Sequence, residues 1–233
     1  MRIFLDSASV SEIENWLGEG VVDGVTTNPS IMFKDRVFDL EEGARYIARI
    51  IGNRPLSVEV TSNHRAEMLS QARSFSRWAP NIVVKIPIIN EFGESSLGVI
   101  STLKEEGIAV NATAILSFNQ SILAAKAGAT YVSIFAGRVA DEGNDPSLVI
   151  RNVRQWLDAW ALSAEIIVGS IRSVMDIQNA ALAGAHVITI PPQFFSKMLD
   201  HKYTRETVKQ FNLDADKALE QIAVARTAAA GAS

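Results

Sequence analysis

The sequence predicts an α/β fold, a closed (β/α)8 or TIM barrel with an extra C-terminal helix. Three observations lead to this prediction: eight short β-rich runs recur along 233 residues, helical patterns separate them, and no linker divides the chain. The runs lie about 26 residues apart on average, which is the length of one βα unit. Most are apolar on both faces, as expected for parallel strands covered on both sides. Eight such units most simply close into a barrel.

The predicted strands follow one another from the N-terminus to residue 190. They are Ile3–Leu5, Gly24–Thr27, Ser57–Val60, Ile82–Ile86, Ala109–Thr113, Tyr131–Phe135, Glu165–Gly169 and Val187–Ile190. A doubly wound open sheet is the alternative, but its first strand is typically followed by a glycine-rich phosphate loop. Here Asp6-Ser7-Ala8-Ser9 stands in that place. The sequence therefore favours the barrel.

Cap signals predict where several of the intervening helices begin and end. Ser9 with Glu12 has the spacing of a capping box. Asp145-Pro146 is typical of an N-cap followed by proline in the first turn. Ala-Gly-Ala at 127–129 and again at 183–185 predicts helices that end on a glycine just before the next strand.

The chain beyond the eighth strand departs from the βα pattern. Residues 200–233 are predicted to form a C-terminal helical extension, with an amphipathic helix from Leu213 to Ala225 after a polar stretch. The last residues, 228–233, are expected to form a frayed tail. We predict one barrel domain over residues 1–233 that includes this extension.

Composition excludes several classes of protein. The chain is 48% hydrophobic and 21% charged, which is typical of a globular protein. Its 22 basic and 26 acidic residues give a net charge of −4, so nothing favours nucleic-acid binding. With 0 cysteines and 3 scattered histidines, we expect no metal and no cofactor. We also expect no signal peptide and no membrane span, hence a cytoplasmic protein.

Polar residues gather at the carboxyl ends of the predicted strands, where barrels of this kind place their active sites. The set consists of Asp6, Thr27, Asn28, Glu59, Lys85, Asn111, Thr113, Ser133, Arg138, Ser170 and Arg172. The eighth strand ends in Pro191-Pro192 and is expected to contribute no chemical group.

Lys85 is the most informative of these residues, because it is the only charge in a buried-strand sequence, Ile82–Pro87. A buried ammonium is costly unless it is paired or loses its proton, and a free amine is a nucleophile toward carbonyls. The structural alternative is a lysine paired with Asp6 or Glu59 for stability alone. Two carboxylates near one amine could instead divide the proton transfers of a reaction.

The remaining groups predict what such an amine would act on. Neutral amides and hydroxyls suit the hydroxyl groups of a substrate or a trapped water, and Arg138 with Arg172 could hold a phosphate. The chemistry implied is condensation of the amine with a carbonyl to give an iminium, beside which a carbon–carbon bond breaks or forms. No metal is required.

Seven motifs of the chain resemble the transaldolase family, specifically its short-chain branch, which includes the fructose-6-phosphate aldolases. They are FLD at 4–6, DGVTTNPS at 23–30, VVKIP at 83–87, NAT at 111–113, AKAGA at 125–129, SIFAGR at 133–138 and GSIR at 169–172. The resemblance runs from Arg2 to about Leu199.

The resemblance implies a role for each matching position. Lys85 corresponds to the Schiff-base lysine and Asp6 to the acid/base that takes the hydroxyl proton, while Glu59 and Thr113 position a catalytic water. The positions implied in substrate binding are Thr27, Asn28, Asn111, Ser133 and Phe135, with Arg138, Ser170 and Arg172 at the phosphate.

The reaction implied is transfer of a dihydroxyacetone unit from fructose 6-phosphate or sedoheptulose 7-phosphate to erythrose 4-phosphate or glyceraldehyde 3-phosphate, as in the pentose phosphate pathway. An aldolase that releases free dihydroxyacetone is the alternative. Glu59 and Phe135 match transaldolases, whereas the aldolases typically have glutamine and tyrosine there. A non-catalytic barrel that binds phosphosugars is a third possibility, which the intact Lys85, Asp6 and Glu59 disfavour.

The family further implies a homo-oligomer, often a decamer of two pentamers, with the C-terminal helix reaching a neighbour.

Overall fold

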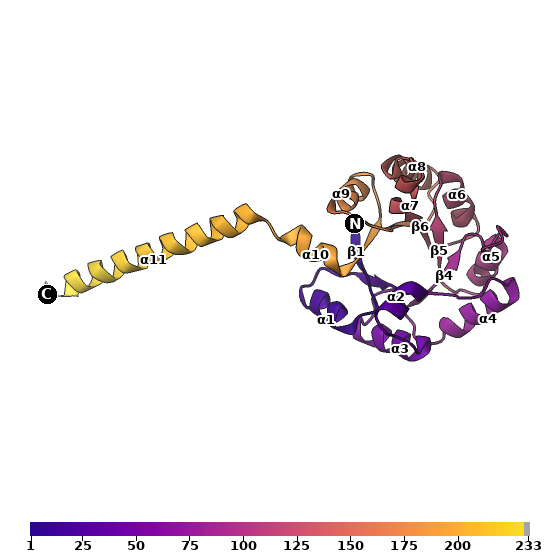
Figure 1. The fold of residues 1–233 in the computed structure, drawn as a ribbon, viewed down its shortest axis with the longest axis horizontal. Helices are drawn as coiled ribbons and strands as arrows, with labels where there is room; N and C mark the ends of the chain where they lie inside the picture. Colours follow the sequence, from indigo (N-terminus) through magenta and orange to yellow (C-terminus); the bar gives the residue numbers. More distant parts are fainter. Residues whose placement is uncertain (231–233) are drawn as a thin grey trace. The chain divides into compact units, whose positions relative to one another are not determined.

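The computed structural model describes residues 1–230 and contains a closed barrel of eight parallel strands, in the order β1 to β8 (Figure 1). The strands are β1 (Arg2–Asp6), β2 (Gly24–Thr26), β3 (Leu56–Glu59), β4 (Ile82–Pro87), β5 (Val110–Ile115), β6 (Tyr131–Phe135), β7 (Glu165–Gly169) and β8 (Val187–Ile190). Pairing of β8 with β1 closes the barrel. The predicted fold class is confirmed, and each of the eight strands lies where the sequence predicted it.

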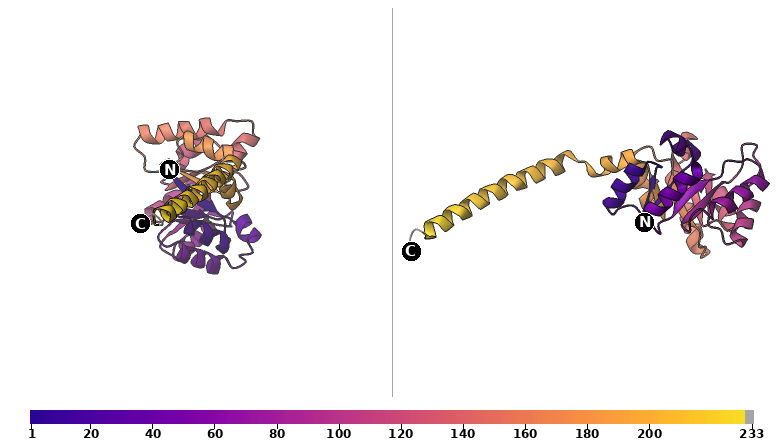
Figure 2. Two further views of the ribbon diagram at one scale, coloured as in Figure 1. Left: turned by 90° about the vertical axis from the view of Figure 1, so that its left-hand side faces the viewer. Right: turned by 90° about the horizontal axis from the view of Figure 1, so that it is seen from below.

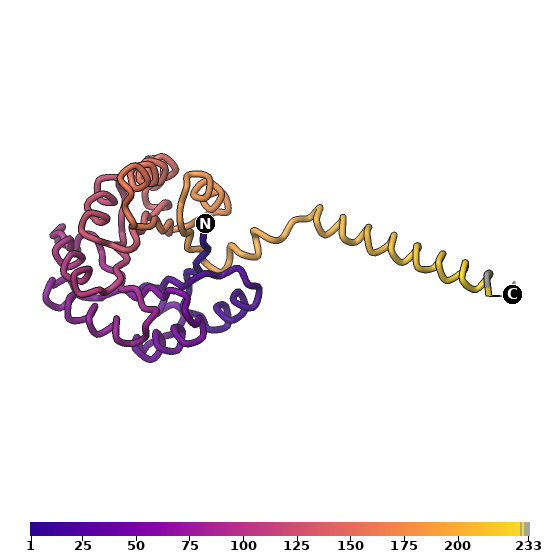
Figure 3. The backbone as a smooth tube through the Cα atoms, turned by 180° about the vertical axis from the view of Figure 1, so that it is seen from behind, coloured from indigo at the N-terminus to yellow at the C-terminus, as the bar shows by residue number. Residues whose placement is uncertain are grey.

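Helices surround the strands of the barrel (Figures 1 and 3). They are α1 (Val10–Gly18), α2 (Pro29–Lys34), α3 (Leu40–Ile50), α4 (Arg65–Phe75), α5 (Leu97–Glu105), α6 (Phe118–Lys126), α7 (Ala136–Asp141), α8 (Pro146–Ala159) and α9 (Val174–Leu182), followed in the chain by α10 (Pro192–Leu199). The short helices α2 and α7 follow β2 and β6 directly. Both therefore begin at the carboxyl end of the barrel, where the predicted site residues lie.

Most of the predicted cap signals work as expected. Asp145 accepts a hydrogen bond from Ser147 N at 2.8 Å, and Pro146 opens α8. Gly128 and Gly184 follow α6 and α9 with φ angles of +97° and +94°, a conformation that favours glycine. These turns direct the chain into β6 and β8.

The capping box predicted at Ser9 does not form. The Ser9 side chain makes no cap hydrogen bond, and Glu12 accepts instead from Trp16 Nε1 at 3.2 Å. A complete capping box occurs at the start of α9, where the Ser173 hydroxyl accepts from Asp176 N and the Asp176 carboxylate accepts from Ser173 N. At Ser9 the spacing is present without the box, and the Glu12 carboxylate bonds the indole N–H of Trp16 one turn later.

The amino-terminal half of the barrel interior is closed by apolar side chains. A buried cluster of Phe4, Val83, Tyr131, Ile167 and Val187 joins five strands. The rings of Phe4 and Tyr131 meet edge to face at 6.3 Å. This packing leaves the polar strand ends at the opposite, carboxyl-terminal side of the barrel.

Strand register brings predicted site residues side by side. Glu59 on β3 pairs with Lys85 on β4, and Lys85 pairs in turn with Asn111 on β5. The strand next to β3 is β2, whose Thr26 pairs with Asp6 on β1. The sheet itself therefore sets the amine beside one carboxylate and one amide.

The chain divides into two compact units, Met1–Phe194 and Phe195–Ser233. The second contains α11 (Lys202–Ala230), one continuous helix (Figure 2). The helix predicted over 213–225 is confirmed, but it begins earlier and also includes 228–230, which were expected to be frayed. The rest of the predicted tail, 231–233, lies outside the described residues. The single domain over 1–233 stays a prediction.

None of the helices within residues 1–230 combines the length and the apolar character that a membrane span requires.

Candidate active site

A pocket of about 200 Å³ lies among the carboxyl ends of the strands. Its lining consists of Asp6, Thr26, Asn28, Lys85, Asn111, Ser133, Phe135, Arg138, Gly169, Ser170 and Thr189. Most of the predicted site residues are thus brought together in one cavity. Four predicted residues are absent from this lining, and they are Thr27, Glu59, Thr113 and Arg172.

Lys85 reaches this pocket from β4 with a side chain that is only 5% exposed. Its Nζ lies 3.1 Å from Glu59 Oε2 and donates a hydrogen bond to the Thr27 carbonyl oxygen at 2.9 Å. A buried charge is tolerated when it is paired and hydrogen-bonded in this way. The alternative partner considered from the sequence, Asp6, makes no ion pair with Lys85, so Glu59 is the carboxylate that neutralises the amine.

Thr27 contributes through its backbone. Its hydroxyl donates to the Ser57 carbonyl oxygen at 2.8 Å, and only its own carbonyl oxygen contacts Lys85. The Thr27 side chain is therefore used to join β2 to β3, next to the amine.

Thr113 lies on β5, opposite Pro87 of β4, and its side chain is buried. The Thr113 hydroxyl has no hydrogen-bond partner among the described residues. A register shift between Ala112 and Ile115, with Ala114 at a φ of +58°, marks a bulge at this point of the strand. A buried hydroxyl without a hydrogen-bond partner costs folding free energy. Its position near the active site therefore indicates that a water or a ligand forms the hydrogen bond.

Asp6 is the last residue of β1, and one of its two carboxylate oxygens is hydrogen-bonded by a neighbouring strand. The Thr26 hydroxyl donates to Asp6 Oδ1 at 2.7 Å. Burial raises the pKa of the Asp6 carboxyl, while the positive charge of Lys85 and the hydrogen bond from Thr26 partly offset that rise. A raised pKa makes the ionised carboxylate a stronger proton acceptor, which suits a group that takes a proton from a substrate.

A chain of neutral groups crosses the pocket floor. Ser133 donates to Asn111 Oδ1 at 2.7 Å, and Asn111 Nδ2 donates to Ser57 Oγ at 3.2 Å. Asn28 serves two purposes, because it lines the pocket and its Oδ1 accepts from Ile31 N at 2.8 Å as the N-cap of α2. These contacts fix the orientation of the amides that face the cavity.

At the basic end of the site, the backbone of Gly137 lies close to Ser170 and Arg172. A Cβ on Gly137 would lie 2.3 Å from the Ser170 carbonyl oxygen and 2.8 Å from Arg172 Nε. Ser170 itself has a φ of +58°, a strained value of the kind found at functional sites. The guanidinium of Arg172 makes two hydrogen bonds to Asp141, one of them at 2.6 Å. Arg138 lines the pocket, whereas Arg172 is held beside it by this carboxylate.

Sequence reasoning missed several residues that build the site. The eighth strand was expected to contribute no chemical group, but Thr189 lines the pocket and its hydroxyl lies 2.5 Å from that of Thr26. Ser57 and Asp141 were missed as well, because each acts by orienting another side chain. Thr189 lies two residues before Pro191, and a hydroxyl at this point of an otherwise apolar strand is the signal that could have found it.

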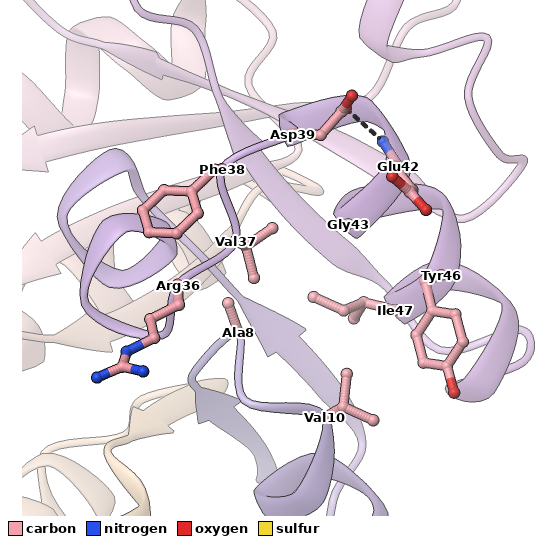
Figure 4. Close-up of a pocket in the computed structure, with 10 residues that line it drawn as sticks. All are labelled: Ala8, Val10, Arg36, Val37, Phe38, Asp39, Glu42, Gly43, Tyr46 and Ile47. Atoms are coloured by element: carbon pink, nitrogen blue, oxygen red, sulfur yellow. Dashed lines mark hydrogen bonds between the residues drawn. The ribbon is translucent and has the colours of Figure 1, made fainter.

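A second and larger hollow, of about 380 Å³, lies where the starts of α1 and α3 meet the loop after α2 (Figure 4). Ala8, Val10, Val37 and Ile47 point toward its middle. None of the predicted site residues lines this hollow, so the larger of the two cavities is not the candidate active site.

Comparison with known proteins decides the family. The family model for transaldolase/fructose-6-phosphate aldolase matches residues 3–231. The chain belongs to this family. The resemblance predicted from the sequence motifs is confirmed, and the chain is an enzyme of the transaldolase/fructose-6-phosphate aldolase family.

Relatives within the transaldolase/fructose-6-phosphate aldolase family are similar over nearly their whole length. "Probable transaldolase 2" of Listeria monocytogenes is 45% identical over 215 residues, which cover 92% of this chain and 95% of the relative. "Probable transaldolase" of Lactiplantibacillus plantarum is 41% identical over 214 residues, covering 92% and 96%.

Solved structures of distant sequence share the fold alone. A mandelate oxidase superposes with a TM-score of 0.57 at 13% identity, covering 82% of this chain and 65% of the oxidase. A thiamine phosphate pyrophosphorylase from Pyrococcus furiosus superposes with a TM-score of 0.56 at 11% identity, covering 82% and 85%.

Proposed function

We propose that this enzyme is a transaldolase that carries a dihydroxyacetone unit on Lys85. The donor is a ketose phosphate, fructose 6-phosphate or sedoheptulose 7-phosphate, and the acceptor is erythrose 4-phosphate or glyceraldehyde 3-phosphate. One observation carries the proposal: a buried amine, paired with Glu59 at 3.1 Å, shares a pocket with the separately held carboxylate of Asp6.

The reaction begins at the amine. Glu59 takes the ammonium proton, and Lys85 Nζ attacks the C2 carbonyl of the ketose to give a carbinolamine. Glu59 returns the proton to the carbinolamine hydroxyl, so that water leaves and an iminium forms. Asp6 then takes the proton of the C4 hydroxyl while the C3–C4 bond breaks. The electron pair of that bond moves into the iminium to give an enamine, and the aldose phosphate that begins at C4 leaves the pocket. The enamine attacks the acceptor aldehyde, and Asp6 returns its proton to the new hydroxyl.

Water leaves when the iminium forms and is consumed when the product is released. We assign its placement to Glu59 and Thr113, because Glu59 adjoins the amine and the Thr113 hydroxyl is buried without a partner among residues 1–230. A water held there would satisfy that hydroxyl and lie within reach of a carboxylate that can move its proton.

The rest of the pocket fits a polyhydroxylated phosphate ester. Asn28, Asn111 and Ser133 offer amides and a hydroxyl to the donor hydroxyl groups. Arg138, Ser170 and Arg172 form the basic end, where a phosphate can accept charge-assisted hydrogen bonds. Asp141 fixes the guanidinium of Arg172, which limits the rotamer freedom lost on binding.

Replacing Gly137 by alanine is expected to raise the KM for fructose 6-phosphate about tenfold, because Ser170 or Arg172 must move away from the new Cβ. Steady-state kinetics with phosphorylated and unphosphorylated donors would measure the change. Gly98→Ala is the matched control, since a Cβ at Gly98 on α5 meets nothing within 4 Å. An equal rise in KM for an unphosphorylated donor would contradict a role in holding phosphate.

Transfer is favoured over release of free dihydroxyacetone by two side chains of the site. Phe135 lines the pocket and has no hydroxyl to protonate the enamine carbon, so the enamine persists until an aldehyde arrives. Glu59 is the second, because the aldolases of the family typically have glutamine there. Fructose-6-phosphate aldolase remains the second candidate function, since the family includes both activities.

The test is an assay of fructose 6-phosphate cleavage with and without erythrose 4-phosphate. We expect sedoheptulose 7-phosphate to form with the acceptor, and almost no dihydroxyacetone to form without it. Comparable rates of dihydroxyacetone release in the absence of acceptor would refute the transfer reaction and favour the aldolase. Phe135→Tyr supplies the matched variant, in which release without acceptor is expected to increase.

We propose that the enzyme acts in the cytoplasm as a homo-oligomer, a decamer of two pentamers. Support comes from α11, whose apolar side chains Phe211, Leu219 and Ile222 are 66%, 64% and 48% exposed. Size-exclusion chromatography with light scattering is expected to give a mass near ten times 25.3 kDa. The double variant Phe211→Glu, Leu219→Glu should give a smaller particle, whereas Gln221→Glu on the same helix should not. A monomeric wild-type chain would refute this proposal.

A further inference from the structure

The hydroxyls of Thr189 and Thr26 form a chain that ends on Asp6. Thr26 Oγ1 lies 2.7 Å from Asp6 Oδ1 and 2.5 Å from Thr189 Oγ1. The strands β2 and β8 are the two neighbours of β1, so the two threonines come from the strands on either side of Asp6, and only Thr26 contacts it. Thr26 and Thr189 are only 2% and 6% exposed. Two buried hydroxyls from residues 163 apart in sequence are thus connected in series to one carboxylate, with Thr26 in direct contact and Thr189 behind it.

The direction of the two hydrogen bonds follows from the donors available. An ionised carboxylate only accepts, so the single hydroxyl hydrogen of Thr26 is donated to Asp6. Thr26 then has no hydrogen left for Thr189, which must be the donor of the second bond. Within residues 1–230, Asp6 Oδ2 has no hydrogen-bond partner. One carboxylate oxygen is therefore occupied and the other is free to meet a ligand in the pocket.

The charges around Asp6 oppose one another. Lys85 on β4 lowers the pKa of the Asp6 carboxyl, whereas Asp35 after α2 and Glu59 on β3 raise it in addition to the larger effect of burial. A hydroxyl that donates to the ionised form favours that form, and a second donor polarises the first. The two threonine hydroxyls therefore stabilise the ionised form of Asp6 without adding a charge of their own.

We propose that Thr189 is a positioning residue for Asp6: through Thr26 it keeps Oδ1 as an acceptor and leaves Oδ2 for the proton of the substrate hydroxyl. The inference rests on the proposed function, in which Asp6 takes that proton. The threonines themselves exchange no proton in the reaction, because the transfer runs between the substrate hydroxyl and Oδ2 alone.

The test compares the full-length enzyme with Thr189→Val and Thr189→Ser in the pH profile of kcat. Removing the hydroxyl weakens the bond that favours ionised Asp6, so the acidic limb should move to higher pH, by about half a unit for Thr189→Val. Thr26→Val should move it further, by about one unit, because the direct donor is lost. Thr189→Ser keeps the hydroxyl and should restore the wild-type limb.

Controls separate this effect from a general loss of packing. Thr102→Val removes a threonine hydroxyl on α5 that bonds only the Gly98 carbonyl oxygen, and it should leave the limb in place. Thr189→Ala replaces Thr189→Val if the latter does not fold. An unmoved acidic limb in the variants that lack the Thr189 hydroxyl would overturn the inference, even if kcat or stability fell. Failure of the proposed function is distinguishable, since Asp6→Asn would then retain wild-type turnover.

Discussion

Replacing Lys85 by methionine is expected to lower the turnover of dihydroxyacetone transfer by at least about 10⁴-fold, because no other amine can form the iminium in this pocket. Methionine approximates the length of the lysine stem, so the β4 strand keeps its packing. The loss should appear in kcat, measured with fructose 6-phosphate and erythrose 4-phosphate. Activity within tenfold of the wild type would contradict the role of Lys85.

Stability must be controlled in this experiment, because Lys85→Met leaves the Glu59 carboxylate without its ion-pair partner. Breaking a buried pair on one side typically costs about 3–5 kcal/mol of unfolding free energy. The double variant Lys85→Met, Glu59→Gln removes both charges and should regain much of that stability in denaturant titrations. It should still lack activity, which separates the chemical role of the amine from the structural role of the pair.

Replacing Asp6 by asparagine is expected to lower kcat by about 10²–10⁴-fold, the usual contribution of a positioned acid/base group. Asparagine keeps an oxygen that can accept the hydrogen bond from Thr26, so the geometry of the site is retained. The amine is untouched, and condensation with the donor should therefore still occur. Single-turnover kinetics would separate the two steps, with cleavage slowed and condensation preserved. Loss of condensation instead of cleavage would contradict the assignment.

The barrel was predictable because its signal is local. Each strand is a short apolar run bounded by a helix end and a turn, and the glycines at 128 and 184 mark where helices stop. Parallel strands in sequence order also fix which ends meet, so Glu59 and Lys85 were expected at the same end of the barrel. The sequence left Asp6 and Glu59 both open as partners of Lys85, and the register of β3 against β4 decides for Glu59. The core of the site was predictable for the same reason.

The parts that sequence reasoning missed depend on contacts between distant segments. The bond between Thr26 and Thr189 joins β2 to β8, and it exists only because the barrel closes. Asp141 fixes Arg172 across 31 residues, between α7 and the loop after β7. The early start of α11 at Lys202 was missed because a polar stretch shows no apolar periodicity to predict a helix.

Borohydride reduction in the presence of fructose 6-phosphate, followed by peptide mass spectrometry, tests the central claim most directly. The Schiff base should be trapped as a covalent adduct on the peptide that contains Lys85. Asp6→Asn should give only the uncleaved six-carbon adduct, and Lys85→Met should give none. Absence of an adduct in the wild type, or an adduct that persists in Lys85→Met, would contradict the proposed mechanism.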